Sequence, residues 1–293
     1  RVKRAYGMAL TPFGVLLAGR MGHHFGLGMS ANGGDCADCD SGDAADRVAF
    51  LVPLASHVWA LAYDRSATGP ITRRPDGVRS VDPEPSDDVH TLSFAFLRFH
   101  EEAARERRRR AGKGSFEYGG LLSHRFQSGD VPASYVPTAR PVDLGPSQLV
   151  HRGYSATVLG GWLRATLPWL RAETEVAYVT AKVDQVSLIP GVELRQPARS
   201  KQLGVAFESE LGSPDGPATA GLDAGYASGD PAPGFGAFPG ANAKPAQKGD
   251  LDGPQASPPR DNRVDNFRFH PDYRIARILF REIIGTVTDA VYV

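Results

Sequence analysis

Carboxylates crowd one short stretch of the sequence, "DCADCDSGD", around its only two cysteines. The four aspartates of this stretch are Asp35, Asp38, Asp40 and Asp43. Several carboxylate oxygens are the ligands that a hard cation such as Ca²⁺ takes, so the four form a candidate calcium site. The spacing does not fit an EF-hand, because Gly42 precedes Asp43 and position 49 is alanine. A solvated loop, with Asp46 paired to Arg47 or to another charge at the barrel end, is the alternative that the sequence favours.

The cysteines and histidines offer little further chemistry. Cys36 and Cys39 form a single Cys-x-x-Cys pair, which indicates zinc only weakly without a second pair. In an oxidising exterior a local disulfide between them is the better prediction. Eight histidines are spread along the chain, and no nucleophile motif accompanies them. We therefore expect no enzyme and no cofactor beyond the candidate calcium, and a Ser–His lipid hydrolase stays as the weaker alternative.

A second set of charged residues lies inside stretches where polar and apolar residues alternate. In a β-strand, neighbouring side chains point to opposite faces, so these charges share one face and apolar side chains the other. Arg or Lys on a lipid-facing surface costs roughly 2–4 kcal/mol at mid-depth, so we expect the charges to line an interior. Their mixed signs fit either a polar, conducting path or ion pairs that fill a narrow barrel. The set is Arg171, Glu173, Glu175, Glu208, Glu210, Asp223, Arg277 and Arg281.

The strands that must position these charges are visible as period-two patterns. In "KQLGVAFESEL" (201–211), Val205 and Phe207 share one parity while Glu208 and Glu210 share the other. After a Gly/Pro-rich turn the alternation resumes, which predicts a β-hairpin. The same reading along the chain predicts about twelve strands, near 2–10, 14–21, 47–54, 57–64, 89–100, 115–126, 153–167, 170–184, 201–211, 218–228, 266–283 and 286–293.

The connections between these strands alternate between short and long. Tight turns such as "TPFG" and "GSPDGP" alternate with long polar loops near 30–46, 65–88, 127–150, 185–200 and 229–265. This order is typical of outer-membrane β-barrels, which have short turns on one side and long loops on the other. One connection differs: residues 101–114, "EEAARERRRRAGKG", form a charged block where a short turn is expected. We interpret it as a solvated charge run, with a short helix as the alternative.

Composition narrows the class of protein further. The chain of 293 residues has 33 basic and 33 acidic residues, so its net charge of zero argues against a nucleic-acid partner. No apolar run reaches the roughly 18 residues of a membrane helix. The 33 glycines and 23 prolines suit many turns and a strand face of small residues. The small face fits a barrel interior that long side chains crowd.

One segment carries a family resemblance. "GRMGHHFGLGMSANGGDCADCDSGDAADRVAFLVPL", followed by "ALAYD", combines an aromatic-Gly-Leu-Gly stretch, an Asn/Gly/Asp-rich loop and "DRV" at the next strand. It resembles uncharacterised outer-membrane β-barrel proteins of myxobacteria and related Gram-negative bacteria, and it is more distantly similar to alginate-export-type porins. "DAGYASGD" and the final 27 residues, from "FRFHPDYR" onward, resemble later strands of such barrels. The chain begins with Arg1 and lacks the C-terminal Phe usual in these barrels, so we expect a piece of a longer protein.

These observations together predict an all-β fold. We expect residues 1–293 to form a single domain, an antiparallel up-and-down transmembrane β-barrel of the outer-membrane type, either whole or a fragment of a larger barrel. The expected function is a porin-like channel that passes or exports a polar solute across the outer membrane of a Gram-negative bacterium, with an anionic solute as one candidate. Expected partners are membrane lipid, lipopolysaccharide and the small solute. The alternatives are a structural or surface-interaction barrel without transport and the lipid hydrolase.

Overall fold

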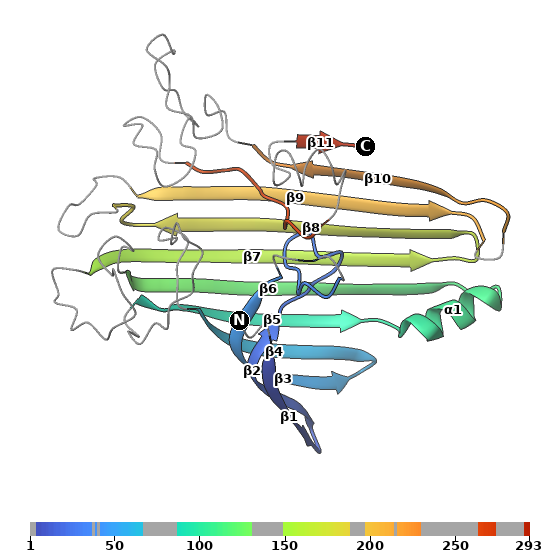
Figure 1. Cartoon of the computed structure of the whole chain (residues 1–293), viewed down its shortest axis with the longest axis horizontal. Coiled ribbons are helices and arrows are strands. Elements are labelled where there is room, and N and C mark those ends of the chain that lie inside the picture. Colours follow the sequence, from blue (N-terminus) through green and yellow to red (C-terminus); the bar gives the residue numbers. More distant parts are fainter. Residues whose placement is uncertain are drawn as a thin grey trace, which may run out of the picture.

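The described part of the chain forms one antiparallel β-sheet with a single short helix (Figure 1). The structure is a computed structural model that describes residues 4–36, 39, 42–66, 87–130, 149–187, 197–213, 216–229, 263–273 and 290–293. The elements are β1 (Ala5–Thr11), β2 (Gly14–Gly22), β3 (Ala44–Leu54), β4 (His57–Ser66), β5 (Val89–Arg98), α1 (Glu102–Arg110), β6 (Ser115–Asp130), β7 (Val150–Thr166), β8 (Leu170–Val183), β9 (Ala198–Leu211), β10 (Ala220–Ala227) and β11 (Ala290–Tyr292).

The eleven strands follow one another as a meander, and each pairs with the next in sequence. Short connections join the strands at one end of the sheet, where Ala55 and Ser56 take positive φ angles of 53° and 61° in the β3–β4 turn. Two such residues match the twist of a tight hairpin. The all-β antiparallel prediction and its short-turn side are therefore confirmed. Among the described residues, the edge strands β1 and β11 do not pair, so this part of the sheet is open.

Three sequence predictions are refined by the structure. The charged block at 101–114 contains α1, so the helical alternative was right. Residues 266–273 of the predicted strand 266–283 form no strand, because they cross one face of the sheet instead (Figure 1). The rest of that prediction lies outside the described residues, as do most of the long polar loops. The predicted strand 153–167 begins earlier, at Val150, and a register shift between Gln127 and Gly129 of β6 lies opposite its first residues.

The two faces of the sheet show the reverse of the pattern in a water-soluble sheet, whose exposed face is polar and whose buried face is apolar. From β3 to β10, one face, called the outer face here, carries large apolar side chains that are exposed; the other, the inner face, carries polar side chains that are buried. The edge strand β1 differs, because its exposed Tyr6, Met8 and Leu10 are register partners of inner-face positions of β2. Fully buried Glu117, Glu173 and Glu175 lie on the inner face. Exposed apolar residues of the outer face include Val48, Leu61, Tyr63, Leu92, Phe94, Leu122, Leu159, Leu163, Val176, Tyr178, Leu203, Leu222 and Tyr226.

Two segments that are not strands cover part of the inner face. Residues 25–32 follow β2, residues 263–273 precede β11, and the two meet where the His270 amide donates to the Met29 carbonyl (2.8 Å). Met29, Phe267 and Phe269 form a buried cluster with alanines of β8, β9 and β10. The small inner-face residues predicted from the sequence are the surface on which these segments pack.

Gly204 of β9 shows this packing most directly. Its inner side is filled by the Phe267 ring, and a Cβ atom at Gly204 would overlap that ring.

No helix in the described part of the chain is long and apolar enough to cross a membrane.

We predict that Gly204→Val destabilises the fold by about 1–3 kcal/mol, since the ring must move to admit the new side chain. Gly161→Val is the matched control, because a Cβ atom at Gly161 meets nothing within 4 Å and valine suits a strand. Urea titration followed by tryptophan fluorescence measures both. Equal costs for the two variants would contradict the packing described.

Candidate functional site on the inner face

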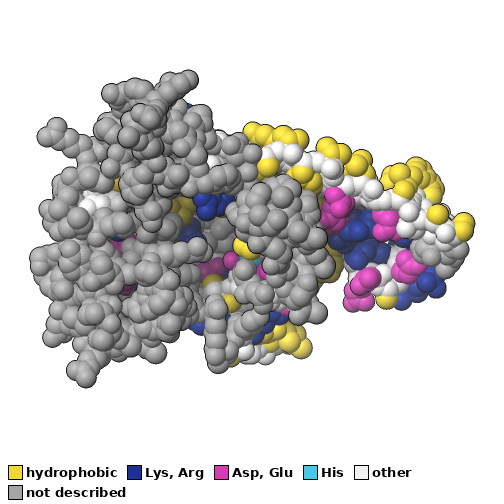
Figure 2. Space-filling view, turned by 45° about the horizontal axis from the view of Figure 1, so that its top comes forward, with side chains coloured by type: hydrophobic (Ala, Val, Ile, Leu, Met, Phe, Trp, Pro, Cys, Tyr) yellow, Lys and Arg dark blue, Asp and Glu magenta, His cyan; other side chains and the backbone are white. Residues whose placement is uncertain are grey.

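A row of charged residues crosses the inner face at right angles to the strands. Five residues on five neighbouring strands are register partners in turn: Glu117, Arg164, Glu173, Glu208 and Asp223. Because partners directly opposite each other have neighbouring side chains, the register alone places these charges within reach of one another. Figure 2 shows the Arg and Lys side chains of this region gathered among Asp and Glu in a hollow, with hydrophobic side chains along its rim.

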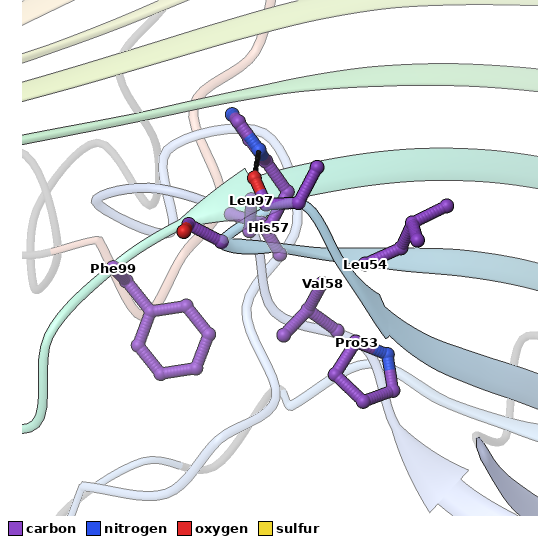
Figure 3. Close-up of a pocket in the computed structure, with 8 residues that line it drawn as sticks. Pro53, Leu54, His57, Val58, Leu97 and Phe99 are labelled. Atoms are coloured by element: carbon purple, nitrogen blue, oxygen red, sulfur yellow. Dashed lines mark hydrogen bonds between the residues drawn. The ribbon is translucent and has the colours of Figure 1, made fainter. Parts of the chain in front are cut away.

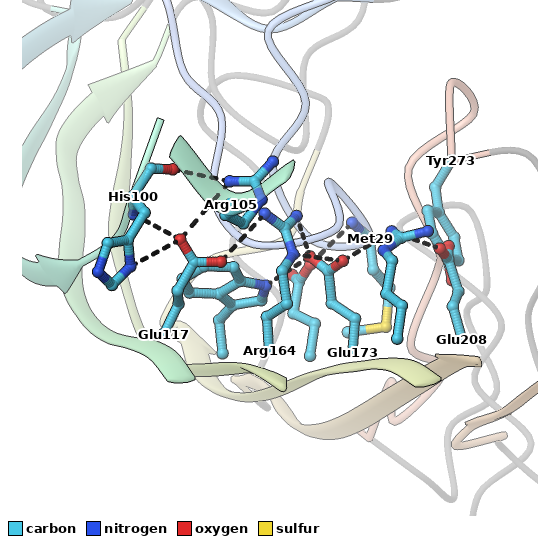
Figure 4. Close-up of polar contacts among 11 residues, drawn as sticks. Met29, His100, Arg105, Glu117, Arg164, Glu173, Glu208 and Tyr273 are labelled. Atoms are coloured by element: carbon cyan, nitrogen blue, oxygen red, sulfur yellow. Dashed lines mark hydrogen bonds and ion pairs between the residues drawn. The ribbon is translucent and has the colours of Figure 1, made fainter. Parts of the chain in front are cut away.

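Glu173 is the centre of the row (Figure 4). Arg164 donates to both of its oxygens, at 2.6 and 2.8 Å, and Arg171 donates to Oε2 at 2.7 Å. The indole of Trp162 adds a third donor at 2.8 Å. A fully buried carboxylate costs much free energy unless such donors meet it, and two-point binding by Arg is the strong form of that contact.

The two arginines extend the network along the row. Arg164 Nη1 lies 3.6 Å from Glu117 Oε2, and Arg171 Nη2 lies 3.6 Å from Glu208 Oε2. Tyr273, from the segment crossing the inner face, donates its hydroxyl to Glu208 at 3.1 Å. Burial and the neighbouring Glu208 charge raise the pKa of the Tyr273 hydroxyl, so it stays protonated and can donate.

The helix α1 is fastened to the same network at the short-turn end. Arg105 lies 3.5 Å from Glu117 and donates to the His100 carbonyl at 2.8 Å. Arg109 donates to the carbonyls of Pro168 and Gly212, in the β7–β8 and β9–β10 turns, at 3.2 and 2.7 Å. The arginines of the charged block thus tie the turns of three hairpins together.

Glu175 lies on the same face as Glu173 but has different partners. Its carboxylate accepts from the backbone N–H groups of Met29 (3.1 Å) and Ser30 (3.0 Å) and from the Ser30 hydroxyl (2.6 Å). It therefore holds residues 25–32 against the wall instead of joining the row of ion pairs.

The structure brings together about half of the residues predicted as an interior lining. Arg171, Glu173, Glu175 and Glu208 lie on one face within or beside the network, as described above. Glu210 is the register partner of Arg171 on that face, and Asp223 is exposed at the end of the row. Arg277 and Arg281 lie outside the described residues, so their placement stays a prediction.

The predicted calcium loop has other partners for its described carboxylates. Asp35 forms an ion pair with Arg4, and Asp43 accepts from the Asn32 amide at 3.2 Å and lies 3.6 Å from His270 Nε2. Asp38 and Asp40 lie outside the described residues. In the described part of the chain, no three His, Cys, Asp or Glu side chains are grouped to hold a metal ion. Cys36 and Cys39 form the predicted disulfide.

Sequence reasoning missed several members of the network. Glu117 alternates with Phe116 and Tyr118, and Arg164 follows the same rule beside Leu163. The period-two signal that identified Glu173 was therefore present in β6 and β7 as well. Arg105 carries no such signal, because its position depends on where α1 lies relative to the sheet.

An open pocket of about 300 Å³ lies at the short-turn end of β3, β4 and β5 (Figure 3). Its histidine, His57, donates from Nδ1 to the Ala55 carbonyl at 2.7 Å and accepts from the Tyr118 hydroxyl at Nε2, at 2.9 Å. Both ring nitrogens are thus occupied, so His57 is not poised as a base for the adjacent Ser56. The pocket is lined by Pro53, Leu54, Ala55, Ser56, His57, Val58, Leu97 and Phe99.

The chain matches no protein-family model, and its sequence matches no curated protein. The resemblance to myxobacterial outer-membrane barrels therefore stays a prediction. The geometry provides an inner face of mixed charge and an apolar outer face on the other side of the same sheet.

We predict that Arg164→Met destabilises the fold by about 3–5 kcal/mol, since it leaves two buried carboxylates, Glu117 and Glu173, without the cation between them. Lys182→Met is the control: its ion pair with Asp184 is about half exposed and contributes about 1 kcal/mol or less. Urea unfolding of both variants and the parent measures the difference. A cost for Arg164→Met no larger than that of the control would contradict the role given to the network.

Proposed function

We propose that the sheet is the wall of a transmembrane β-barrel in the outer membrane of a Gram-negative bacterium, and that the barrel passes a polar solute. The observation that carries the proposal is the inverted sheet, with apolar side chains exposed on the outer face and charged side chains buried on the inner face. In water, an exposed apolar surface of this extent is unfavourable, whereas lipid is a favourable partner for it.

The outer face of β8 supports the proposal in its length and composition. From Leu170 to Tyr178 its outer positions are Leu, Ala, Thr, Val and Tyr, and the next charge on this face is Lys182. Nine strand residues extend about 26 Å at roughly 3.3 Å per residue. A tilted membrane strand needs about 9–11 residues, so the apolar part of β8 has a suitable length.

Aromatic rings near both ends of the outer face add to this support. Trp59 and Phe96 lie side by side near the short-turn end, with ring centroids 5.6 Å apart. Tyr63 stacks on His90 near the other end, with centroids 5.9 Å apart. Aromatic side chains with one apolar and one polar side favour the two interfaces of a membrane.

The proposal requires that the edges of the sheet be closed. Unpaired backbone groups cannot face lipid, so β1 and β11 must pair with each other or with further strands. A barrel of this type belongs with the myxobacterial-type family that the sequence resembles, with lipid and lipopolysaccharide as its surroundings.

One observation favours a second candidate function. Residues 25–32 and 263–273 occupy part of the inner face, so the interior is partly filled. A barrel whose interior is closed by such segments would serve as a structural or surface-interaction protein without transport.

We predict that cysteine labelling separates the two faces of β10. Leu222 and Asp223 are exposed neighbours on opposite faces, and the native cysteines are joined in a disulfide. In membrane vesicles, a charged, water-soluble maleimide should react quickly with Asp223→Cys and slowly with Leu222→Cys, because lipid shields the latter. Rapid reaction of Leu222→Cys would overturn the assignment of the outer face to lipid.

We predict that the purified full-length protein, extracted in detergent, gives stepwise conductance in planar lipid bilayers. The mixed charge of the inner face should make ion selectivity weak. Heat-modifiable mobility on gels, as folded barrels show, is the control for insertion of a folded protein. A folded, inserted protein without conductance would favour the non-transporting barrel.

A further inference from the structure

Residues 25–32 lie against the inner face in a folded conformation that their own sequence favours. The Gly28 amide donates to the Phe25 carbonyl (2.9 Å), and the Phe25 amide donates to the Ala31 carbonyl (3.1 Å), so the segment is a compact loop. Gly26 and Gly28 take positive φ angles of 58° and 79°, which glycine adopts without strain. We call residues 25–32 the inner loop.

The inner loop fits the wall on two sides. Phe25 packs with Leu121 and Trp162, and a Cβ atom at Gly160 would come within 3.1 Å of its ring. On the other side Met29, fully buried, packs in the cluster that includes Ala177 of β8. In Figure 4, Met29 lies next to the charged residues of the inner face.

One charged side chain joins the inner loop to the wall. The Glu175 carboxylate accepts hydrogen bonds from Met29 and Ser30 of the inner loop. Glu173, two residues earlier on the same face, is instead bound by Arg164, Arg171 and Trp162 of the wall itself. The two carboxylates are equally buried and differ in what they hold.

We propose that Glu175 is a latch that fastens the inner loop across the lumen as a constriction, and that release of this latch widens the path for solute. The constriction rests on the proposed function, whereas the latch itself does not. A buried carboxylate is a strong acceptor for the loop's N–H and O–H donors, and an amide in its place offers one acceptor oxygen and no charge.

The latch is tested by the reactivity of a cysteine in the inner loop. Ala31 is buried, 8% exposed, and Ala31→Cys adds only a thiol, so the variant reports when the loop leaves the wall. Adding Glu175→Gln should raise the rate of maleimide labelling by about tenfold, the change expected from losing one charged hydrogen bond. Asp184→Asn, which also removes one carboxylate charge but at a half-exposed side chain paired with Lys182, should leave the labelling rate of Ala31→Cys close to that of its parent.

A second variant keeps the test decisive if Glu175→Gln does not fold. Ser30→Ala removes one donor from the loop side and leaves the wall unchanged, so it should raise labelling in the same direction by a smaller factor. Circular dichroism and heat-modifiable mobility confirm that each variant is folded. Labelling that neither Glu175→Gln nor Ser30→Ala increases would overturn the latch.

Conductance separates the latch from the channel. If the parent conducts, Glu175→Gln should raise its single-channel conductance, and an unchanged value despite faster labelling would overturn the constriction. If neither protein conducts while labelling becomes faster, the latch stands and the proposed channel fails.

Discussion

A carboxylate that leaves water must be met by donors, and on the inner face this requirement determines the arrangement of neighbouring strands. Glu173 is fully buried, and its donors come from two strands: Arg164 and Trp162 from β7 and Arg171 from β8. A shift of β7 by one residue would turn Arg164 to the other face and leave the carboxylate buried without its strongest partner. The register of the sheet and the pairing of its charges therefore depend on each other.

The same register sets the outer face. Because side chains alternate along a strand, fixing Glu173 and Glu175 inward fixes Val176 and Tyr178 outward. The apolar outer face is thus a direct consequence of the paired charges within. The proposed membrane location would make both faces favourable at once, since lipid would contact the apolar side while the ion pairs stay on the polar side.

Much of this could be predicted from the sequence, and the limit has a physical reason. Strand positions, turn side and the inward direction of Glu173 and Glu208 follow from local alternation, which a single strand displays by itself. The inner loop does not, because its position depends on contacts between Glu175 and residues almost 150 positions earlier. The same limit explains why residues 266–273 were wrongly predicted as a strand. Their alternation of apolar residues fits a strand, but their position depends on distant contacts, because Phe267 and Phe269 pack on glycine and alanine of the sheet.

The most direct test of this account is a spin-label scan along the part of β8 that we propose to cross the membrane, from Leu170 to Tyr178, with the protein in lipid vesicles. We expect a period of two: labels at even positions should be accessible to oxygen, which enters lipid, and those at odd positions less so. The opposite phase would place the charged face against lipid, and uniform access to a water-soluble nickel reagent would place the strand in water. Either result would contradict the inverted sheet as a membrane wall.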